Sequence, residues 1–235
     1  MLVVRGRLMG DNPREFADPP QRVLPRFRSR SLSSTIGPHL YLASASPRRR
    51  ELLSQVGLRH VALPQQVDEA ALPRESAPVY VLRIATAKAR AALGDPLRRL
   101  PVPLLSADTA VVCDGEIFGK PESLADARRM LQALAGRTHQ VLTAVVVCRG
   151  DQWRETVVST DVEFREIAED EIAAYWASGE PLDKAGAYAI QGLAALFVKR
   201  CNGSYSNVVG LPLYETAELL QDFGITVTSL LATRP

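Results

Sequence analysis

The residues best suited to chemistry lie in short segments spread along the chain. In residues 43–50 (ASASPRRR), small hydroxylated residues come directly before three arginines. Ser46 and Pro47 suit the N-cap and the first turn of a helix, where free backbone N–H groups and the helix dipole attract anions. We therefore expect an anion-binding site at this helix start. A capped helix with solvated arginines is the alternative.

An acidic residue follows an apolar run in residues 106–109 (SADT). We expect Asp108 to lie where a strand ends. A carboxylate in that position can bind a divalent cation or act as a general base toward water. The alternative is a turn in which Asp108 hydrogen-bonds its own backbone.

Two further segments place a lysine near glycine and proline. Residues 118–121 (FGKP) hold Lys120 in a rigid turn that would aim its ammonium group at a phosphate. Residues 179–192 (GEPLDKAGAYAIQG) are too rich in glycine and small residues for a helix, and such a loop lets the backbone approach a ligand. A surface lysine and a mobile surface loop are the ordinary alternatives.

Composition narrows the class of protein. Of the 235 residues, 46% are hydrophobic and 23% are charged, with a formal net charge of +2, as in a soluble globular protein. No apolar run approaches the roughly 18 residues of a membrane span. The arginines at 48–50 could suggest nucleic acid, but acids are spread among the basic residues along the chain and no aromatic stacking platform is visible. The three cysteines lack metal-ligand spacing and indicate buried thiols in a reducing, cytoplasmic compartment.

The elements that must position these segments mix strands and helices without a strict βαβ alternation. We expect strands over residues 39–44, 60–63, 103–107, 110–113, 139–148, 153–164 and 194–199. We expect helices from Pro47 to Val56 and over residues 78–93, 124–135, 169–178 and 212–223. This pattern predicts an α/β (mixed α+β) domain with a strongly twisted mixed sheet, flanking helices and a cleft between two lobes.

The N-terminal residues differ from the rest. Residues 1–38 alternate arginine with proline, serine and a few acids, and they lack apolar periodicity. We interpret them as a disordered extension, or as upstream sequence from a misplaced start codon, with the folded domain over residues 39–235.

In order and composition, these segments resemble the Maf family over residues 39–224. The matching motifs are S-x-S-P-R-R at 44–49, V-D-E at 67–69, K-A at 88–89, S-A-D-T at 106–109, G-K-P at 119–121, the loop from 179 and N-V-V-G-L-P at 207–212. The resemblance implies a fold similar to the inosine triphosphate pyrophosphatases. It also implies hydrolysis of nucleoside triphosphates between the α and β phosphates with Mg²⁺, Mn²⁺ or Co²⁺.

The resemblance further implies a role for individual residues. Asp108 corresponds to the proton acceptor and is a candidate ligand of the cation, and Glu69, Lys88 and Lys120 correspond to polar catalytic residues. Phosphate or nucleotide binding falls to Ser44, Arg49, Asp183 and Lys184. Three of the four lysines of the chain lie on these motifs.

Three positions distinguish two subtypes of the family. In the family that this chain resembles, the type that cleaves 7-methyl-GTP has an aromatic residue, Gln and Glu at the three positions where this chain has Arg48, Thr109 and Gln191. An arginine repels a cationic methylated base, whereas Arg48 and Gln191 match the carbonyl and N–H groups of thymine and uracil. We therefore predict a dTTP and UTP pyrophosphatase that cleans nucleotide pools. The alternatives are the 7-methyl-GTP type, action on 5-methyl-UTP or pseudo-UTP, and a non-enzymatic regulator of septum formation; a homodimer is possible.

Overall fold

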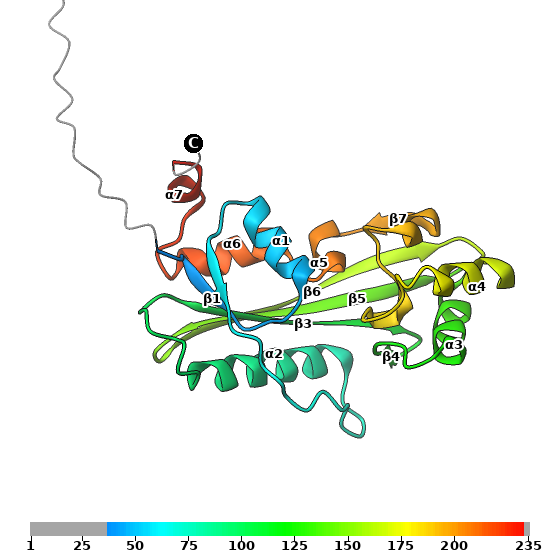
Figure 1. Ribbon diagram of the computed structural model, residues 1–235, viewed down its shortest axis with the longest axis horizontal. Helices are drawn as coiled ribbons and strands as arrows, with labels where there is room; N and C mark the ends of the chain where they lie inside the picture. The colour runs from blue at the N-terminus through cyan, green and yellow to red at the C-terminus, as the bar shows by residue number, and fades with distance from the viewer. Residues whose placement is uncertain (1–36, 233–235) are drawn as a thin grey trace, which may run out of the picture. The chain divides into compact units, whose positions relative to one another are not determined.

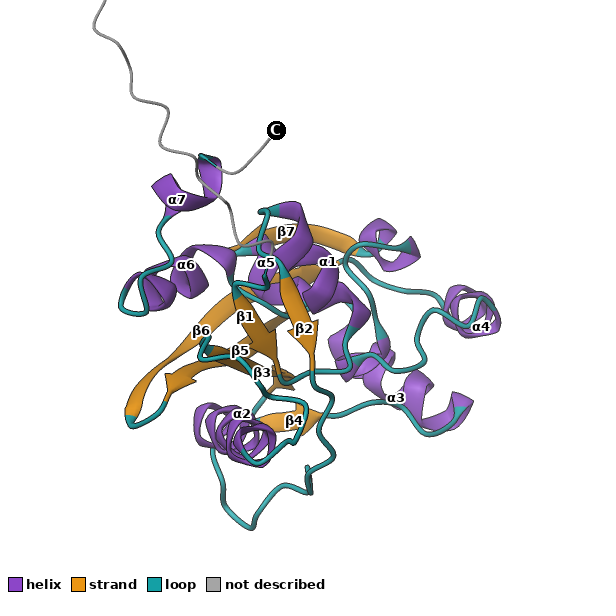
Figure 2. Ribbon diagram, turned by 60° about the vertical axis from the view of Figure 1, so that its left-hand side comes forward, coloured by secondary structure: helices purple, strands orange, loops and turns teal. Residues whose placement is uncertain are grey.

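A seven-stranded mixed sheet organises the computed structural model, which describes residues 37–232 (Figures 1 and 2). The strand order is β2-β1-β3-β5-β6-β7, and β4 pairs with β3. The strands are β1 (Leu40–Leu42), β2 (His60–Ala62), β3 (Leu104–Cys113), β4 (Glu116–Phe118), β5 (Thr138–Arg149), β6 (Gln152–Phe164) and β7 (Val198–Asn202). Strand β1 runs parallel to β2 and β3, and the other pairs are antiparallel, so the predicted mixed sheet is confirmed.

Helices cover both faces of the sheet. They are α1 (Pro47–Gln55), α2 (Ala77–Leu93), α3 (Leu124–Leu134), α4 (Glu169–Ala177), α5 (Tyr205–Val209), α6 (Leu213–Gln221) and α7 (Val227–Leu231), with single 3₁₀ turns η1 (Ala185–Ala187) and η2 (Leu193–Leu196). Helix α2 packs on one face through Val81, Ala85 and Ala89. Helices α1 and α6 lie on the opposite face (Figure 1). The predicted α/β class is thereby confirmed.

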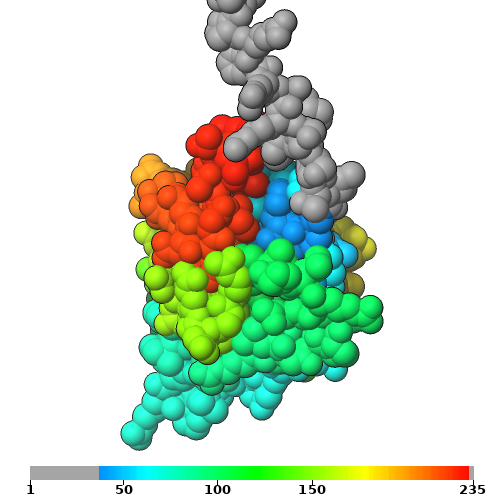
Figure 3. Space-filling view, turned by 90° about the vertical axis from the view of Figure 1, so that its left-hand side faces the viewer, coloured from blue at the N-terminus to red at the C-terminus, as the bar shows by residue number. Residues whose placement is uncertain are grey.

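The β5–β6 hairpin extends to helix α6. At its turn, Gln152 Nε2 donates to the carbonyl of Asp222 at 3.0 Å, directly after α6. Figure 3 shows this face, with the residues of α6 and α7 in red above the yellow-green hairpin turn. This contact joins the end of α6 to the hairpin turn.

Strand β3 differs from the prediction in one important respect. We expected two strands separated at Asp108 and Thr109, but β3 continues from Leu104 to Cys113 and pairs with β5 along almost its whole length. The expectation that Asp108 ends a strand is wrong, because the cross-strand ladder outweighs the turn preference of an Asp-Thr pair.

The opposite edge of β3 is interrupted. Along that edge, β1 pairs with residues 104–105 and β4 pairs with residues 111–113. In the registers of these described strands, residues 106–110 pair with neither. Asp108 therefore lies in the middle of a gap between β1 and β4.

The C-terminal part also departs from the expected elements. The strand predicted over residues 194–199 is instead the 3₁₀ turn η2 followed by β7, and β7 ends at Asn202. Helices α5 and α7 were not predicted, since each has only five residues and too few for a periodic apolar pattern.

Two other predictions, on the N-terminal extension and on membrane spans, can be compared only with residues 37–232. The expected N-terminal extension lies outside them, apart from Gly37 and Pro38. Along residues 37–232, no helix has the length and apolar character needed to cross a membrane.

Candidate active site

A cleft of about 520 Å³ opens at the gap in the sheet. Its walls come from the start of α1, the middle of β3, the end of β4, the loop before α2 and the loop around η1. All eleven predicted site residues line it: Ser44, Arg48, Arg49, Glu69, Lys88, Asp108, Thr109, Lys120, Asp183, Lys184 and Gln191. The structure thus brings together residues that are up to about 147 positions apart, from 44 to 191.

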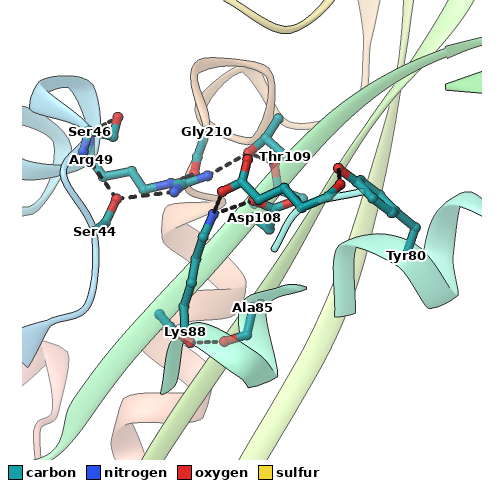
Figure 4. A network of polar contacts seen from close by, with 12 residues as sticks. Ser44, Ser46, Arg49, Tyr80, Ala85, Lys88, Asp108, Thr109 and Gly210 are labelled. Atoms are coloured by element: carbon teal, nitrogen blue, oxygen red, sulfur yellow. Dashed lines mark hydrogen bonds and ion pairs between the residues drawn. The ribbon is translucent and has the colours of Figure 1, made fainter. Parts of the chain in front are cut away.

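Lys88 lies between two carboxylates (Figure 4). From α2, its Nζ lies 2.7 Å from Asp108 Oδ1 on β3 and 2.6 Å from Glu69 Oε1 on the preceding loop. The Lys88 and Asp108 side chains are only 11% and 10% exposed, whereas Glu69 is 46% exposed. This ammonium group therefore joins the helix, the sheet and the loop at one point.

The two carboxylates differ in how readily they hold charge. Burial raises the pKa of Asp108, and the opposing effects of Lys88 and Arg49 do not cancel it. Burial is also the largest single effect on the Glu69 pKa and acts to raise it, but the hydrogen bond and charge of Lys88, with the charges of Lys120 and Arg49, together outweigh it and lower the pKa. Asp108 is consequently the better proton acceptor, because its pKa is moved toward neutral pH.

Helix α2 also fixes the loop that carries Glu69. Tyr80 Oη donates to the Glu69 carbonyl at 2.9 Å. Arg83 donates to the Ala70 carbonyl at 2.9 Å and to both oxygens of Glu75, whose side chain is only 4% exposed. The loop has no helix or strand of its own, so these contacts determine where Glu69 lies.

The start of α1 forms as the sequence predicts. Ser46 is the N-cap, and its hydroxyl accepts from Arg49 N at 3.4 Å, with Pro47 at the first helical position. Ser44 Oγ accepts from Ser46 N at 3.2 Å. This compact turn directs Arg48 and Arg49 to the cleft.

Arg49 is held by protein atoms on three sides. Its Nε donates to the Gly210 carbonyl at 2.8 Å, Nη1 donates to Ser44 Oγ at 3.1 Å and Nη2 donates to Thr109 Oγ1 at 3.0 Å (Figure 4). The side chain is buried, and burial lowers its pKa while Asp108 opposes that effect. Arg49 thus joins the start motif to the residues 207–212.

The loop around η1 forms another wall of the cleft. Gly186 N donates to the Gly119 carbonyl at 2.9 Å, which holds the loop beside the turn of Lys120. Gly186 has φ +67°, and a Cβ there would lie 2.9 Å from Val111 Cγ1, so this close approach requires glycine. Beyond it, the Glu180 carboxylate accepts from Leu193 N at 2.8 Å and closes the loop.

The cations on this wall differ in environment. Lys184 Nζ donates to the Leu182 carbonyl at 3.1 Å, and burial together with nearby Arg48 lowers the pKa of Lys184. Arg48 faces Asp183, which opposes the lowering of the Arg48 pKa by burial. Gln191 is exposed at the edge of the cleft. These side chains can bind an anionic ligand and read hydrogen-bonding groups at its far end.

A cation at this site would depend on few protein ligands. Among residues 37–232, no group of three or more His, Cys, Asp or Glu side chains is arranged for a metal ion. Asp108 and Glu69 do converge on one point, since both contact Lys88. Two carboxylates with substrate oxygens are the donor set that Mg²⁺ prefers.

Several residues of the site were not identified from the sequence. Tyr80 and Arg83 look like ordinary helix residues, and their contacts with the loop leave no local signal. Thr143 lies in an apolar strand and contacts Thr109 at 2.9 Å. Asn207 belongs to a recognised motif, and only the structure shows that its side chain is fully buried.

Comparison with known proteins places the chain in a family. A model described as Maf-like protein matches residues 39–223. The dTTP/UTP pyrophosphatase of Escherichia coli O157:H7 is 51% identical over 184 residues, which cover 78% of this chain and 92% of that protein. The dTTP/UTP pyrophosphatase of Nitrosomonas europaea is 52% identical over 198 residues, which cover 80% of this chain and 96% of that protein.

A solved structure is also similar in part. The structure of the Staphylococcus aureus Ham1 protein aligns with a TM-score of 0.38 and 13% identity, covering 53% of this chain and 71% of that one. This likeness is too low to carry a conclusion.

Proposed function

This chain belongs to the Maf-like family, and on that premise we propose that it hydrolyses dTTP and UTP to the nucleoside monophosphate and pyrophosphate. The observation that carries the proposal is the buried Asp108 carboxylate, which lies 2.7 Å from Lys88 Nζ in a cleft. Five cationic residues line that cleft: Arg48, Arg49, Lys88, Lys120 and Lys184. A triphosphate carries several negative charges, and these cations compensate them.

Asp108 acts as the general base in the proposed reaction. Its carboxylate takes a proton from a water molecule as the water oxygen bonds to the α phosphorus. The bond from the α phosphorus to the oxygen bridging to the β phosphate breaks, and pyrophosphate leaves. The raised pKa of Asp108 supports this role, because a base works best when its pKa lies near the operating pH.

The cations bind and orient the triphosphate. Lys88 keeps Asp108 and Glu69 in place, while Arg49 on α1 and Lys120 after β4 line the same cleft. Lys184 and Asp183 lie on the loop beside Lys120. Fixed charges in a partly buried site stabilise the developing charge on the leaving group more than water does.

We infer that a divalent cation, Mg²⁺, Mn²⁺ or Co²⁺, takes part. Asp108 and Glu69 would hold it together with phosphate oxygens, and its chemistry is to withdraw charge from the phosphates. The convergence of the two carboxylates supports this assignment. EDTA should therefore abolish pyrophosphate release, and added Mg²⁺ or Mn²⁺ should restore it.

Base selection is assigned to Arg48, Gln191 and Thr109. Arg48 and Gln191 both line the cleft and offer donors and an acceptor to thymine or uracil. A cationic 7-methylguanine would meet Arg48, and like charges repel. Action on 5-methyl-UTP and pseudo-UTP fits the same contacts. We also propose that the chain acts on the nucleotide pool of the cytoplasm, because its three cysteines are free thiols, as in a reducing compartment. We do not expect nucleic-acid binding, because acidic residues are spread among the basic ones along the chain.

A nucleotide panel tests the proposal. The purified full chain with Mn²⁺ or Mg²⁺ would be given dTTP, UTP, 5-methyl-UTP, pseudo-UTP, 7-methyl-GTP, dATP and dGTP, and pyrophosphate release would be measured. We expect dTTP and UTP to be cleaved well ahead of 7-methyl-GTP and the purines. The Asp108→Asn variant, purified in parallel, reports any contaminating phosphatase.

Two outcomes would contradict the proposal. Preference for 7-methyl-GTP would assign the chain to the other subtype. No release from any triphosphate would favour a non-enzymatic role in septum formation.

A further inference from the structure

The hydrogen bonds behind Arg49 run in one direction. A guanidinium group only donates, so Thr109 Oγ1 accepts from Arg49 Nη2. Thr143 Oγ1 lies 3.0 Å from the carbonyl of Asn207, which only accepts, so the single hydroxyl proton of Thr143 points there. The 2.9 Å contact between Thr109 and Thr143 must then use the proton of Thr109. The order is therefore Arg49 to Thr109 to Thr143 to the Asn207 carbonyl.

The acceptor end of this series of hydrogen bonds, at Asn207, is held firmly in place. The Asn207 side chain is fully buried, and its Nδ2 donates to the Val141 carbonyl at 2.9 Å and to Thr160 Oγ1 at 3.0 Å. Asn207 therefore fixes α5 on β5 and β6. Three residues later, Gly210 has φ +124° and turns its carbonyl to Arg49 Nε at 2.8 Å. Residues 207–210 thus hold Arg49 directly through the Gly210 carbonyl and indirectly through Thr143 and Thr109.

Thr143 occupies the middle of this arrangement. It lies directly across from Thr109 in the β3–β5 register and has no exposed surface. Its neighbours along β5 are apolar, so packing would be met equally by valine. The hydroxyl group is the feature that packing does not explain.

We propose that Thr143 is a positioning residue for Arg49. Its hydroxyl keeps the Thr109 hydroxyl turned as an acceptor toward the guanidinium, which leaves the remaining N–H groups of Arg49 directed to the triphosphate. This inference rests on the proposed function. Position 109 is one at which the family's subtypes differ. On this inference, Thr109 affects the site through Arg49.

Three single variants test the inference. Thr143→Val keeps the shape and removes the hydroxyl, and we expect kcat/KM for dTTP to fall about tenfold, mainly through KM. Thr143→Ser retains the hydroxyl and should stay within about twofold of wild type. The control is Thr216→Val, because Thr216 is equally buried on α6 and its Oγ1 has no partner among the described residues. This control should leave both kinetic constants unchanged.

A double-mutant cycle separates positioning from general packing. If Thr143 acts through Arg49, Thr143→Val combined with Arg49→Lys should be no slower than Arg49→Lys alone, within about twofold. Two independent losses that multiply would overturn the inference, and so would a Thr143→Val variant that behaves like Thr216→Val while the wild type is active. A wild type that cleaves no triphosphate would overturn the proposed function itself.

Discussion

Asp108→Asn tests whether activity and stability can be separated at one atom. The change replaces one carboxylate oxygen by an amide group and keeps the other, which still accepts from Lys88 where Asp108 Oδ1 now lies at 2.7 Å. Lys88 also retains Glu69 at 2.6 Å, so no buried charge loses its last partner. The fold should therefore survive, while the base is lost.

The effect on stability follows from the raised pKa of Asp108. Burial raises the folded-state pKa above its value in the unfolded chain. The contribution of Asp108 to the free energy of unfolding is then fully present below its pKa in the unfolded chain. It is lost as the pH rises through its pKa in the folded protein. At neutral pH the ionised carboxylate is thus a net destabilising group, and removing it offsets the loss of about 1 kcal/mol from a weaker hydrogen bond.

We expect the free energy of unfolding to change by less than about 1 kcal/mol, which is about 2–4 °C in Tm for a domain of this size. In contrast, kcat should fall about 10²–10⁴-fold, the usual contribution of a general base. Pyrophosphate release and thermal unfolding would be measured on the same preparations. Asp151→Asn, in the exposed β5–β6 turn, is the matched control and should change neither.

Two results would refute this reasoning. A variant that retains more than about one tenth of wild-type kcat would show that Asp108 is not the base. A loss of Tm well beyond about 4 °C would show that the ionised Asp108 stabilises the fold, contrary to the effect of its burial.

Three further predictions concern other parts of the chain. Arg48→Trp with Gln191→Glu should move preference from dTTP and UTP toward 7-methyl-GTP, as a kcat/KM ratio would report; an unchanged ranking would mean that the base is read elsewhere. Removing residues 1–35 should leave kcat and KM within about twofold, and a large loss would show that they contribute to the site. Burial lowers the pKa of His139 to about 4. The free energy of unfolding should therefore have its full value above about pH 6.5 and decrease by up to about 3 kcal/mol as the pH drops toward 4. His139→Gln should flatten that fall, and identical pH profiles would contradict it.

The motifs around the cleft were readable from the sequence because each has a local cause. Ser46 and Pro47 cap a helix by rules that act within four residues, and the structure has that cap. The glycine-rich loop was recognised from its composition, and Gly186 proves to need its positive φ. The cap depends only on neighbours in the sequence, whereas the need for glycine at position 186 also comes from its close approach to Val111 on β3.

Contacts across the sheet were not readable in the same way. Asp108 and Thr109 have the composition of a turn, and only the long ladder between β3 and β5 keeps them extended. Thr143 resembles a tolerated polar residue in an apolar strand until its partner Thr109 is known. Helix α5 is too short to show periodicity, and it exists because Asn207 is anchored on β5 and β6.

The interrupted edge of β3 explains how one strand serves both faces of the sheet. Side chains alternate along a strand, and Ala110 and Val112 pack toward α2 while Ala107 and Val111 pack with α1. Asp108 accordingly meets Lys88 from α2, and Thr109 meets Arg49 from α1. In a complete sheet these two groups would be separated by a neighbouring strand.

The gap between β1 and β4 lets both groups reach one cleft. The register of β3 against β5 then becomes a catalytic requirement as well as a structural one. A slip by one residue would turn Thr109 toward Lys88 and Asp108 toward Arg49, because every side chain would change face. The base would lose the ammonium group that holds it beside Glu69, so the paired strands β3 and β5 fix the chemistry through their alignment.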